Sequence, residues 1–393
     1  MTDLFAWIDR AAPGMVKTWI QIARIETPSA EKAAVDQLVD FLADFARQAG
    51  FQTRVYPFPD SGNGLVITYD TGSEEAPVTL MGHMDTVHEK GLFGASPVTE
   101  EEGFLKGPGV YDCKGGITVA LLVMMALRAA GFRKRSVKLV LSPDEEVSSI
   151  YSGEPGKKYL RENIRGSVMA INCESGSPKG NIVTGRKGVL RLQVDVKGKA
   201  AHAGSDYANG ISAIKEAAHK ILAIEEKSDT RNITYNCGVI KGGTVSNSVP
   251  ERCSFVVDVR YNDMQSLQTA QAHVRKIADT SYLKGTVSEV KVVSSRLPME
   301  ETEGNLALFA HVKAVSRKYG LGELQSCVAG GGSDSCYSVA EGVPSLCAMG
   351  IEGHDQHTLR ERAYIASLAK RAKLIGAAII EYDTEKNREE KLK

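Results

Sequence analysis

The fold is decided by the stretch Val78-Thr79-Leu80-Met81-Gly82-His83-Met84-Asp85, where an apolar run ends on a histidine and an aspartate. Short apolar and β-branched runs bounded by Gly, Pro and Asp are typical of buried strands. The pattern recurs three times: residues 137–141 precede Asp144-Glu145-Glu146, residues 168–172 precede Glu174, and residues 345–349 precede His357. Because an open α/β sheet binds its ligand at the carboxyl ends of its strands, the sequence predicts that these polar residues share one site.

Asp112 is expected at the same place for a different reason. It lies within a predicted loop, residues 107–116, and residues 117–130 form a helix-like apolar stretch closed by Gly131. Asp112 is therefore predicted to lie at or near the start of a helix.

Each of these polar residues has an ordinary explanation when it is taken alone. The pair Glu145-Glu146 is typical of a solvated loop, His83-x-Asp85 often occurs by chance, and His357 has a competitor in His354. Carboxylates that follow buried strands are costly to desolvate unless they are paired or coordinate a metal. Their combination with two histidines therefore favours a two-metal hydrolase site.

Length and composition indicate a two-domain protein of the cytoplasm. The chain has 393 residues, too many for one ordinary core, and its 48 Lys and Arg balance its 48 Asp and Glu. Zero net charge gives no reason to expect nucleic acid or an anionic membrane as a partner. Seven cysteines without a C-x-x-C pair fit free thiols in a reducing compartment. We expect neither a signal peptide in residues 1–7 nor a membrane span.

The order of expected elements places one domain inside another. After a helix that begins at Pro28-Ser29 and ends at Gly50, strand and helix patterns alternate to about residue 183. Strands at 190–196, 233–240, 253–259 and 287–293, with helices at 211–225 and 264–278, then follow the ferredoxin-like order β-α-β-β-α-β. We expect an α/β catalytic domain with a mixed sheet, residues 1–187 and 297–393, interrupted by a ferredoxin-like α+β domain at 188–296. The charged segment 383–393 is predicted to be a frayed tail.

The sequence resembles the zinc exopeptidase family that includes bacterial glutamate carboxypeptidase, acetylornithine deacetylase, succinyl-diaminopimelate desuccinylase and aminoacylase. The resemblance covers nearly the whole chain in order and is strongest to the glutamate carboxypeptidase branch. The matching stretches are Gly82-His-Met-Asp-Thr-Val87, Gly107-Pro-Gly-Val-Tyr-Asp-Cys-Lys-Gly-Gly116, Asp144-Glu-Glu146, Gly198-Lys-Ala-Ala-His-Ala-Gly204, Gly243-Thr-Val-Ser-Asn-Ser-Val-Pro250, Asp258-Val-Arg-Tyr261, Gly330-Gly-Gly-Ser-Asp334 and His357-Thr358.

The resemblance implies two zinc ions in each subunit. It assigns His83 and Glu146 to one ion and Glu174 and His357 to the other, with Asp112 as the bridge. Imidazole and carboxylate are usual zinc ligands, and two neighbouring cations need an anionic bridge. The same ligands would also accept Co²⁺ or Mn²⁺.

Two further carboxylates receive roles from the same resemblance. Asp85 is expected to accept a hydrogen bond from His83 and set its tautomer, the alternative being a turn-capping aspartate. Glu145 is expected to be the general base that takes a proton from the attacking water and delivers it to the leaving amine, the alternative being a spare surface carboxylate.

The inserted domain is expected to be a lid that also forms a homodimer. By resemblance, His202 reaches the partner's active site and stabilises the oxyanion, Asn247 and Arg260 bind a substrate carboxylate, and Gly331 and Gly332 face the substrate. Without the resemblance, His202 is a loop histidine, Arg260 a strand-edge ion pair and the glycines a turn.

The expected function is hydrolysis of an amide next to a free carboxylate in a small-molecule substrate. A carboxypeptidase that releases glutamate is the first hypothesis, an N-acyl-amino-acid deacylase or small amidohydrolase the second, and a catalytically silent binding homologue the third. The roles of Lys179, Arg186, Arg296 and Cys113 stay open, because there the sequence departs from the family pattern or matches it only loosely.

Overall fold

The protein is described from a computed structural model that covers residues 1–390, with side chains described for residues 1–382. Two compact units make up the chain. The first contains Met1–Gly185, Glu301–Val328 and Ser333–Lys393, and the second contains Arg186–Glu300 with Ala329–Gly332. Residues 329–332, which the sequence boundaries assigned to the catalytic domain, thus group with the second unit.

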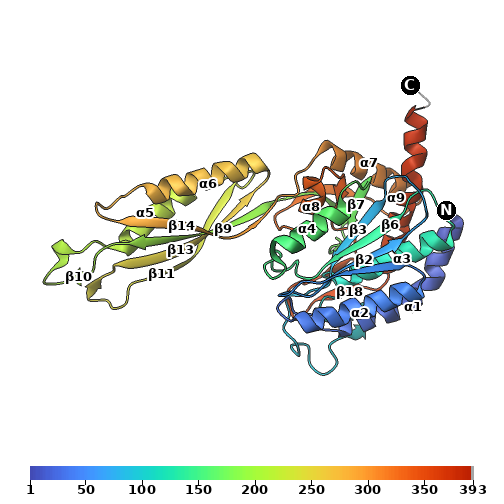
Figure 1. Cartoon of the computed structure of the whole chain (residues 1–393), viewed down its shortest axis with the longest axis horizontal. Helices are drawn as coiled ribbons and strands as arrows, with labels where there is room; N and C mark the ends of the chain where they lie inside the picture. Colours follow the sequence, from blue (N-terminus) through green and yellow to red (C-terminus); the bar gives the residue numbers. More distant parts are fainter. Residues whose placement is uncertain (391–393) are drawn as a thin grey trace. The chain divides into compact units, whose positions relative to one another are not determined.

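The first unit is built on a six-stranded mixed sheet in the order β1-β2-β6-β3-β7-β16 (Figure 1). β6, β3, β7 and β16 run parallel to one another, whereas β2 is antiparallel to β6 and β1 is antiparallel to β2. This confirms the predicted α/β fold with a mixed sheet. The strands are β1 (Gln52–Tyr56), β2 (Gly64–Tyr69), β3 (Val78–His83), β6 (Val137–Ser142), β7 (Met169–Asn172) and β16 (Ser345–Leu346).

The four parallel strands are the four apolar runs that precede polar residues in the sequence. Their register places His83 of β3 beside Ser142 of β6, and Met81 of β3 beside Asn172 of β7. The segments that follow β3, β6 and β7 therefore leave the sheet at one edge, as the sequence predicts.

Helices cover the sheet, and α1, α3 and α9 pack against one another. The helix expected between Pro28 and Gly50 is α2, and Asp112 lies two residues before the start of α3. The prediction of a frayed segment 383–393 is wrong for residues 383–390, where α9 continues; their Glu, Lys and Arg favour helix. Residues 391–393 lie outside the described chain. The helices are α1 (Thr2–Arg24), α2 (Lys32–Gln48), α3 (Lys114–Ala129), α4 (Gly153–Ile164), α7 (Glu303–Lys318), α8 (Ser335–Ala340) and α9 (Ser367–Glu390).

Two smaller sheets complete the first unit. The four-stranded sheet has the order β17-β18-β5-β4, and it places the hairpin that contains His357 beside the segment that leads to Asp112. Its strands are β4 (Thr99–Glu101), β5 (Phe104–Lys106), β17 (Gly353–His354) and β18 (Arg362–Tyr364). The other sheet pairs β8 (Asn181–Arg186) with β15 (Gln325–Ala329).

The second unit has the ferredoxin-like order predicted from the sequence. Its antiparallel strands are arranged β11-β13-β9-β14, and α5 and α6 cover one face (Figure 1). Alternate residues of β9 are buried beneath these helices, as period-two patterning requires. The elements are β9 (Gly188–Lys197), β10 (Ala201–His202), the 3₁₀ helix η1 (Tyr207–Asn209), α5 (Ala213–Glu225), β11 (Thr234–Gly242), β12 (Ser248–Val249), β13 (Arg252–Tyr261), α6 (Met264–Asp279) and β14 (Val287–Arg296).

No helix within residues 1–390 combines the length and the apolar composition needed to cross a bilayer.

The first turn of α3 lies against the chain that leaves β7. A Cβ atom added at Gly116 would lie 1.7 Å from the carbonyl oxygen of Cys173, the residue before Glu174. The Cys113 thiol donates to the same oxygen at 3.3 Å. Gly116 thus permits a backbone approach that brings the Asp112 and Glu174 segments together.

We expect Gly116→Ala to destabilise the protein by about 1–3 kcal/mol, because the added methyl group must push two backbone segments apart. Urea unfolding of both proteins measures this difference. Gly14→Ala in α1 is the control: no atom lies within 4 Å of its added Cβ, and alanine favours a helix interior. Equal stability of the Gly116→Ala variant and the wild type would contradict the close packing.

Candidate metal centre

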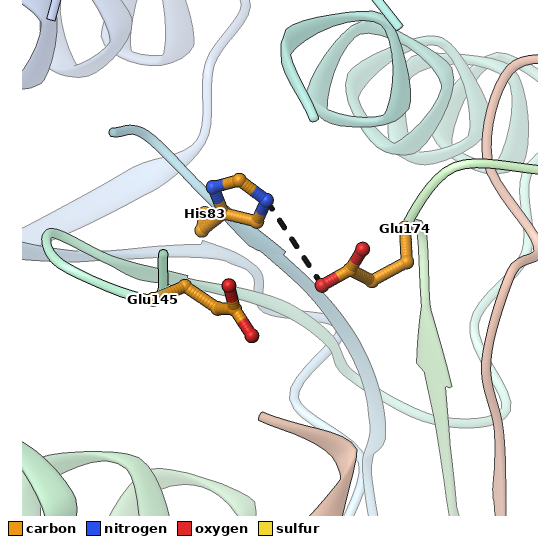
Figure 2. Close-up of side chains that lie close together, drawn as sticks. All are labelled: His83, Glu145 and Glu174. Carbon is orange, nitrogen blue, oxygen red and sulfur yellow. Dashed lines mark ion pairs between the residues drawn. The ribbon is translucent and has the colours of Figure 1, made fainter. Parts of the chain in front are cut away.

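His83 is the buried centre of a cluster at the end of β3. Its Nε2 lies 3.2 Å from Oδ1 of Asp112 and 3.9 Å from Oε1 of Glu174. Figure 2 shows the His83 ring and the Glu174 carboxylate turned toward each other, with the Glu145 side chain beside them. One imidazole thus lies beside carboxylates from two other segments of the chain.

His357 approaches the same aspartate from the other side. It lies between β17 and β18 with a positive φ of 62°, and its Nε2 is 3.3 Å from Oδ2 of Asp112 and 3.2 Å from Oε2 of Glu146. The two carboxylate oxygens of Asp112 therefore face one histidine each. This is the disposition that a bridging ligand between two cations requires.

These distances favour a different pairing of ligands from the one the resemblance implied. His83 lies with Glu174 on one side of Asp112, and His357 lies with Glu146 on the other. The resemblance implied other pairs, His83 with Glu146 and Glu174 with His357, and His83 also lies with Asp112 and Glu146 in a group whose ligand atoms are within 4.8 Å of one another. Sequence order does not reveal the pairing, because it depends on how separate loops converge.

Asp85 contacts both His83 and the Glu145-Glu146 turn through its carboxylate. Its Oδ1 lies 3.2 Å from Nδ1 of His83, and its two oxygens accept the backbone N–H groups of Glu145 and Glu146 at 3.0 and 3.1 Å. Ser29 donates to the same carboxylate at 2.6 Å. Asp85 therefore orients His83 and also sets the Glu145-Glu146 turn. Ser29 was missed in the sequence, where a serine 56 residues away carries no signal.

Glu145 belongs to the cluster by geometry. One ligand atom each from Glu145, His83 and Glu174 lie within 4.8 Å of one another, and the same holds for His83, Asp112 and Glu146. The backbone hydrogen bond to Asp85 fixes where the Glu145 side chain begins. All six predicted residues, His83, Asp112, Glu145, Glu146, Glu174 and His357, are thus brought together in the first unit.

Bound protons offset the repulsion between the neighbouring carboxylates of the cluster, and the pKa values of its members are shifted accordingly. Burial, followed by the charge of Asp112, raises the pKa of Glu146 to about 8. Hydrogen bonds with Asp112 and Glu146 raise the pKa of His357 to about 10. Burial acts to raise the pKa of Asp112, but hydrogen bonds with His357 and His83 outweigh it and hold the value well below its usual range.

The residues present fit two divalent cations. Carboxylates and imidazoles are hard or borderline ligands that suit such ions, and a cation would stabilise the ionised form of Glu146 that burial otherwise opposes. A bound ion and a bound proton are alternative ways of balancing this charge.

The other predicted residues lie in the second unit. The strand pair β10–β12 brings His202 next to Asn247, whose carbonyl accepts the N–H of Ala203 at 2.9 Å. Nδ1 of His202 accepts the N–H groups of Gly204 and Ser205, both at 3.1 Å. Nε2 of a neutral His202 therefore carries the proton and is a donor.

Arg260 is half-buried and pairs with Asp258 of the same strand. Its Nε and Nη2 donate to the two oxygens of that carboxylate at 2.6 and 3.2 Å, and Arg191 donates to it at 3.1 Å. Two guanidinium groups thus share one carboxylate, and one positive charge is left over in this group.

The glycine loop carries two arginines at its side. Arg186 Nη1 donates to the carbonyls of Gly331 and Gly332 at 3.2 and 3.4 Å, and a Cβ added at Gly332 would lie 2.7 Å from Cδ of Arg296. Lys179 is exposed, and Cys113 is buried against Cys173. Arg186 and Arg296 thus join the loop predicted to face the substrate.

A mixed α/β sheet whose strand ends lie beside a cluster of imidazole and carboxylate side chains defines a metal-dependent hydrolase. Peptidase family M20/M25/M40 matches residues 79–381, and the chain belongs to this family. This family match confirms the resemblance found in the sequence.

Individual relatives cover most of the chain. It is similar to carboxypeptidase G2 of Pseudomonas sp. (strain RS-16), with 28% identity over 357 residues, 88% of this chain and 83% of that protein. A tripeptidase structure from Staphylococcus aureus has a TM-score of 0.78 at 22% identity and covers 94% of this chain and 97% of its own. An M20 family metallo-carboxypeptidase from Sulfolobus solfataricus has a TM-score of 0.75 at 16% identity, with 93% and 98% covered. These two structures share the fold.

We expect the metal-free protein to lose stability as pH rises from about 5 to about 7, by on the order of 1–2 kcal/mol. Folded Glu146 keeps its proton up to about pH 8, whereas an unfolded glutamate loses it near 4.5. The folded state therefore binds more protons in this window, and rising pH favours unfolding. Chemical denaturation at several pH values measures the trend.

Glu146→Gln is the matched control, because it removes the titrating group with little change of shape. The free energy of unfolding should depend less on pH in this variant and in the metal-loaded wild type. A metal-free wild type whose stability is constant or rises across the window would contradict the placement of Glu146 against Asp112.

Proposed function

We propose that the protein is a metallo-carboxypeptidase that hydrolyses an amide bond next to a free carboxylate, with glutamate as the first candidate for the released residue. The observation that carries the proposal is the placement of His83 and His357 on the two oxygens of Asp112, with Glu145 beside them. The similarity to carboxypeptidase G2 supports the carboxypeptidase assignment. An N-acyl-amino-acid deacylase uses the same chemistry and is the alternative.

The proposed ligands form two sets that share Asp112. His83 and Glu174 would hold one ion, and His357 and Glu146 would hold the other; zinc is the first candidate and cobalt or manganese are substitutes. When bound, the two cations supply Lewis acidity that polarises the scissile carbonyl and favours ionisation of water.

Glu145 is the proposed general base. Its carboxylate accepts a proton from the attacking water and donates it to the leaving amine, while Asp85 holds its backbone N–H in place. The complete set of ligands together with Glu145 argues against a silent binding homologue, which has no need to keep these buried charges.

Recognition of the substrate carboxylate is proposed for the second unit. The excess positive charge of the Arg260, Arg191 and Asp258 group suits an anion, and Asn247 adds an amide donor. Gly331 and Gly332 are proposed to face the substrate through their backbone groups. His202 carries its proton on Nε2 and is suited to donate to a developing oxyanion.

A homodimer through the second unit is part of the proposal. Leu222 is 72% exposed and Ile214 39% exposed on α5, and Ile240 is 50% exposed on the adjacent edge strand β11. Exposed apolar side chains beside an unpaired strand edge are typical of a surface that another copy covers.

A cytoplasmic location is proposed from the cysteines, all seven of which are free thiols.

We expect the zinc- or cobalt-loaded protein to release amine from N-acyl glutamates and dipeptides with a free α-carboxylate, and not from the same compounds with an amidated carboxylate. The charge that Arg260 and Asn247 would bind is missing from the amides. Amine release with and without chelator measures this. Equal turnover of both series would contradict carboxylate recognition, and the preferred leaving residue separates the carboxypeptidase from the deacylase.

We expect Glu145→Gln to bind two metals and to lower kcat by about 10²–10⁴-fold, because only the proton acceptor is lost. Loss of a metal ion from this variant would make Glu145 a ligand instead.

His202→Ala is expected to lower kcat as well. If His202 acts in the partner's site, mixing the two variants restores activity, to roughly a quarter of wild type for random dimers. No recovery in mixed dimers would contradict action in trans.

A further inference from the structure

A buried carboxylate outside the proposed ligand set contacts the backbone of Asp112. Glu361 is 1% exposed, and its Oε1 accepts the N–H groups of Tyr111 and Asp112 at 2.9 and 3.1 Å. Its Oε2 lies 2.9 Å from Nε2 of His88, which is also buried. Both oxygens of Glu361 are therefore engaged.

The contacts of Glu361 join three segments that each carry a proposed ligand. His88 lies five residues after His83, and the two accepted N–H groups belong to the loop that ends in Asp112. Glu361 itself lies four residues after His357 in the β17–β18 hairpin, and its backbone carbonyl accepts the N–H of Gly107 at 3.2 Å. One side chain thus links the strand end, the bridging loop and the hairpin.

Such a link constrains the direction of the Asp112 side chain. Two consecutive N–H groups held by one carboxylate oxygen fix the orientation of the peptide planes on either side of Tyr111. Asp112 must present one oxygen to each imidazole, so a small rotation of this loop would turn one oxygen away from its histidine. The hairpin that supplies His357 is held by the same group.

We propose that Glu361, oriented by His88, is a positioning residue for the metal centre: it sets the bridging geometry of Asp112 and the reach of His357. The inference rests on the proposed assignment of Asp112 and His357 as metal ligands. Glu361 is not one of the proposed ligands, and it acts through the backbone of Asp112. Groups that orient metal ligands in this way typically contribute 10–100-fold to metal affinity, as an order of magnitude.

The chain contains a chemically matched control in the other unit. Glu216 is fully buried, accepts the consecutive N–H groups of Tyr282 and Leu283 at 3.1 and 2.7 Å, and pairs with Lys220 at 3.0 Å. It therefore makes the same kind of contact as Glu361, but no proposed ligand lies in the segment that it holds. A purely structural carboxylate should behave like Glu216.

The test is cobalt titration of the metal-stripped, full-length protein, followed by visible absorption, which reports the geometry of the bound Co²⁺. We expect Glu361→Ala to weaken binding of the second cobalt ion by about 10–100-fold and to alter its spectrum. Glu361→Gln keeps an oxygen for the two N–H groups and should lose less than about 10-fold. Glu216→Gln should unfold at lower denaturant but bind cobalt as the wild type does.

Steady-state kinetics on the cobalt-saturated proteins provide a second measurement. The Glu361 variants should lower kcat more than they change KM, because substrate-binding groups are untouched. Affinity and spectra of both Glu361 variants equal to those of the wild type would overturn the inference, as would an equal effect in Glu216→Gln. A wild type that binds no cobalt would instead overturn the proposed metal centre, so the two failures are distinguishable.

Discussion

The structure depends on the cost of burying negative charge at one edge of a sheet. Four carboxylates and two imidazoles meet where the parallel strands end, and only Asp112 contacts both imidazoles among the described side chains. Desolvated carboxylates stay ionised only beside positive charge, so protons or metal ions must hold this cluster together. The hydrogen bonds that Asp85 accepts and the close backbone approach at Gly116 hold the segments of this cluster in place.

The division of the chain into two units separates two kinds of chemistry. The first unit holds every group that is suited to bind cations or to move protons at the cluster. The second holds the groups suited to an anion or an oxyanion, namely His202, Asn247 and the Arg260 pair.

Much of this was predictable from local pattern. Apolar runs before His83, Glu145 and Glu174 identified buried strands, because strands that are buried on both faces need continuous apolar residues. The alternation in residues 190–196 likewise identified a half-buried strand of a second sheet. The charged residues 383–390 were misjudged because polarity was taken as disorder, although the same residue types favour helix.

The sequence by itself determined the class of fold, the order of its elements and the residue types of the metal cluster, because strand periodicity and ligand chemistry are local properties. Only the tertiary structure decided which carboxylate lies with which histidine, and that Ser29 and Glu361 support the cluster. Glu361 lies 249 residues from Asp112, whose N–H it accepts, and no local pattern records such a contact. The convergence of distant loops is set by packing of the whole sheet and its helices, and it is therefore visible only in three dimensions.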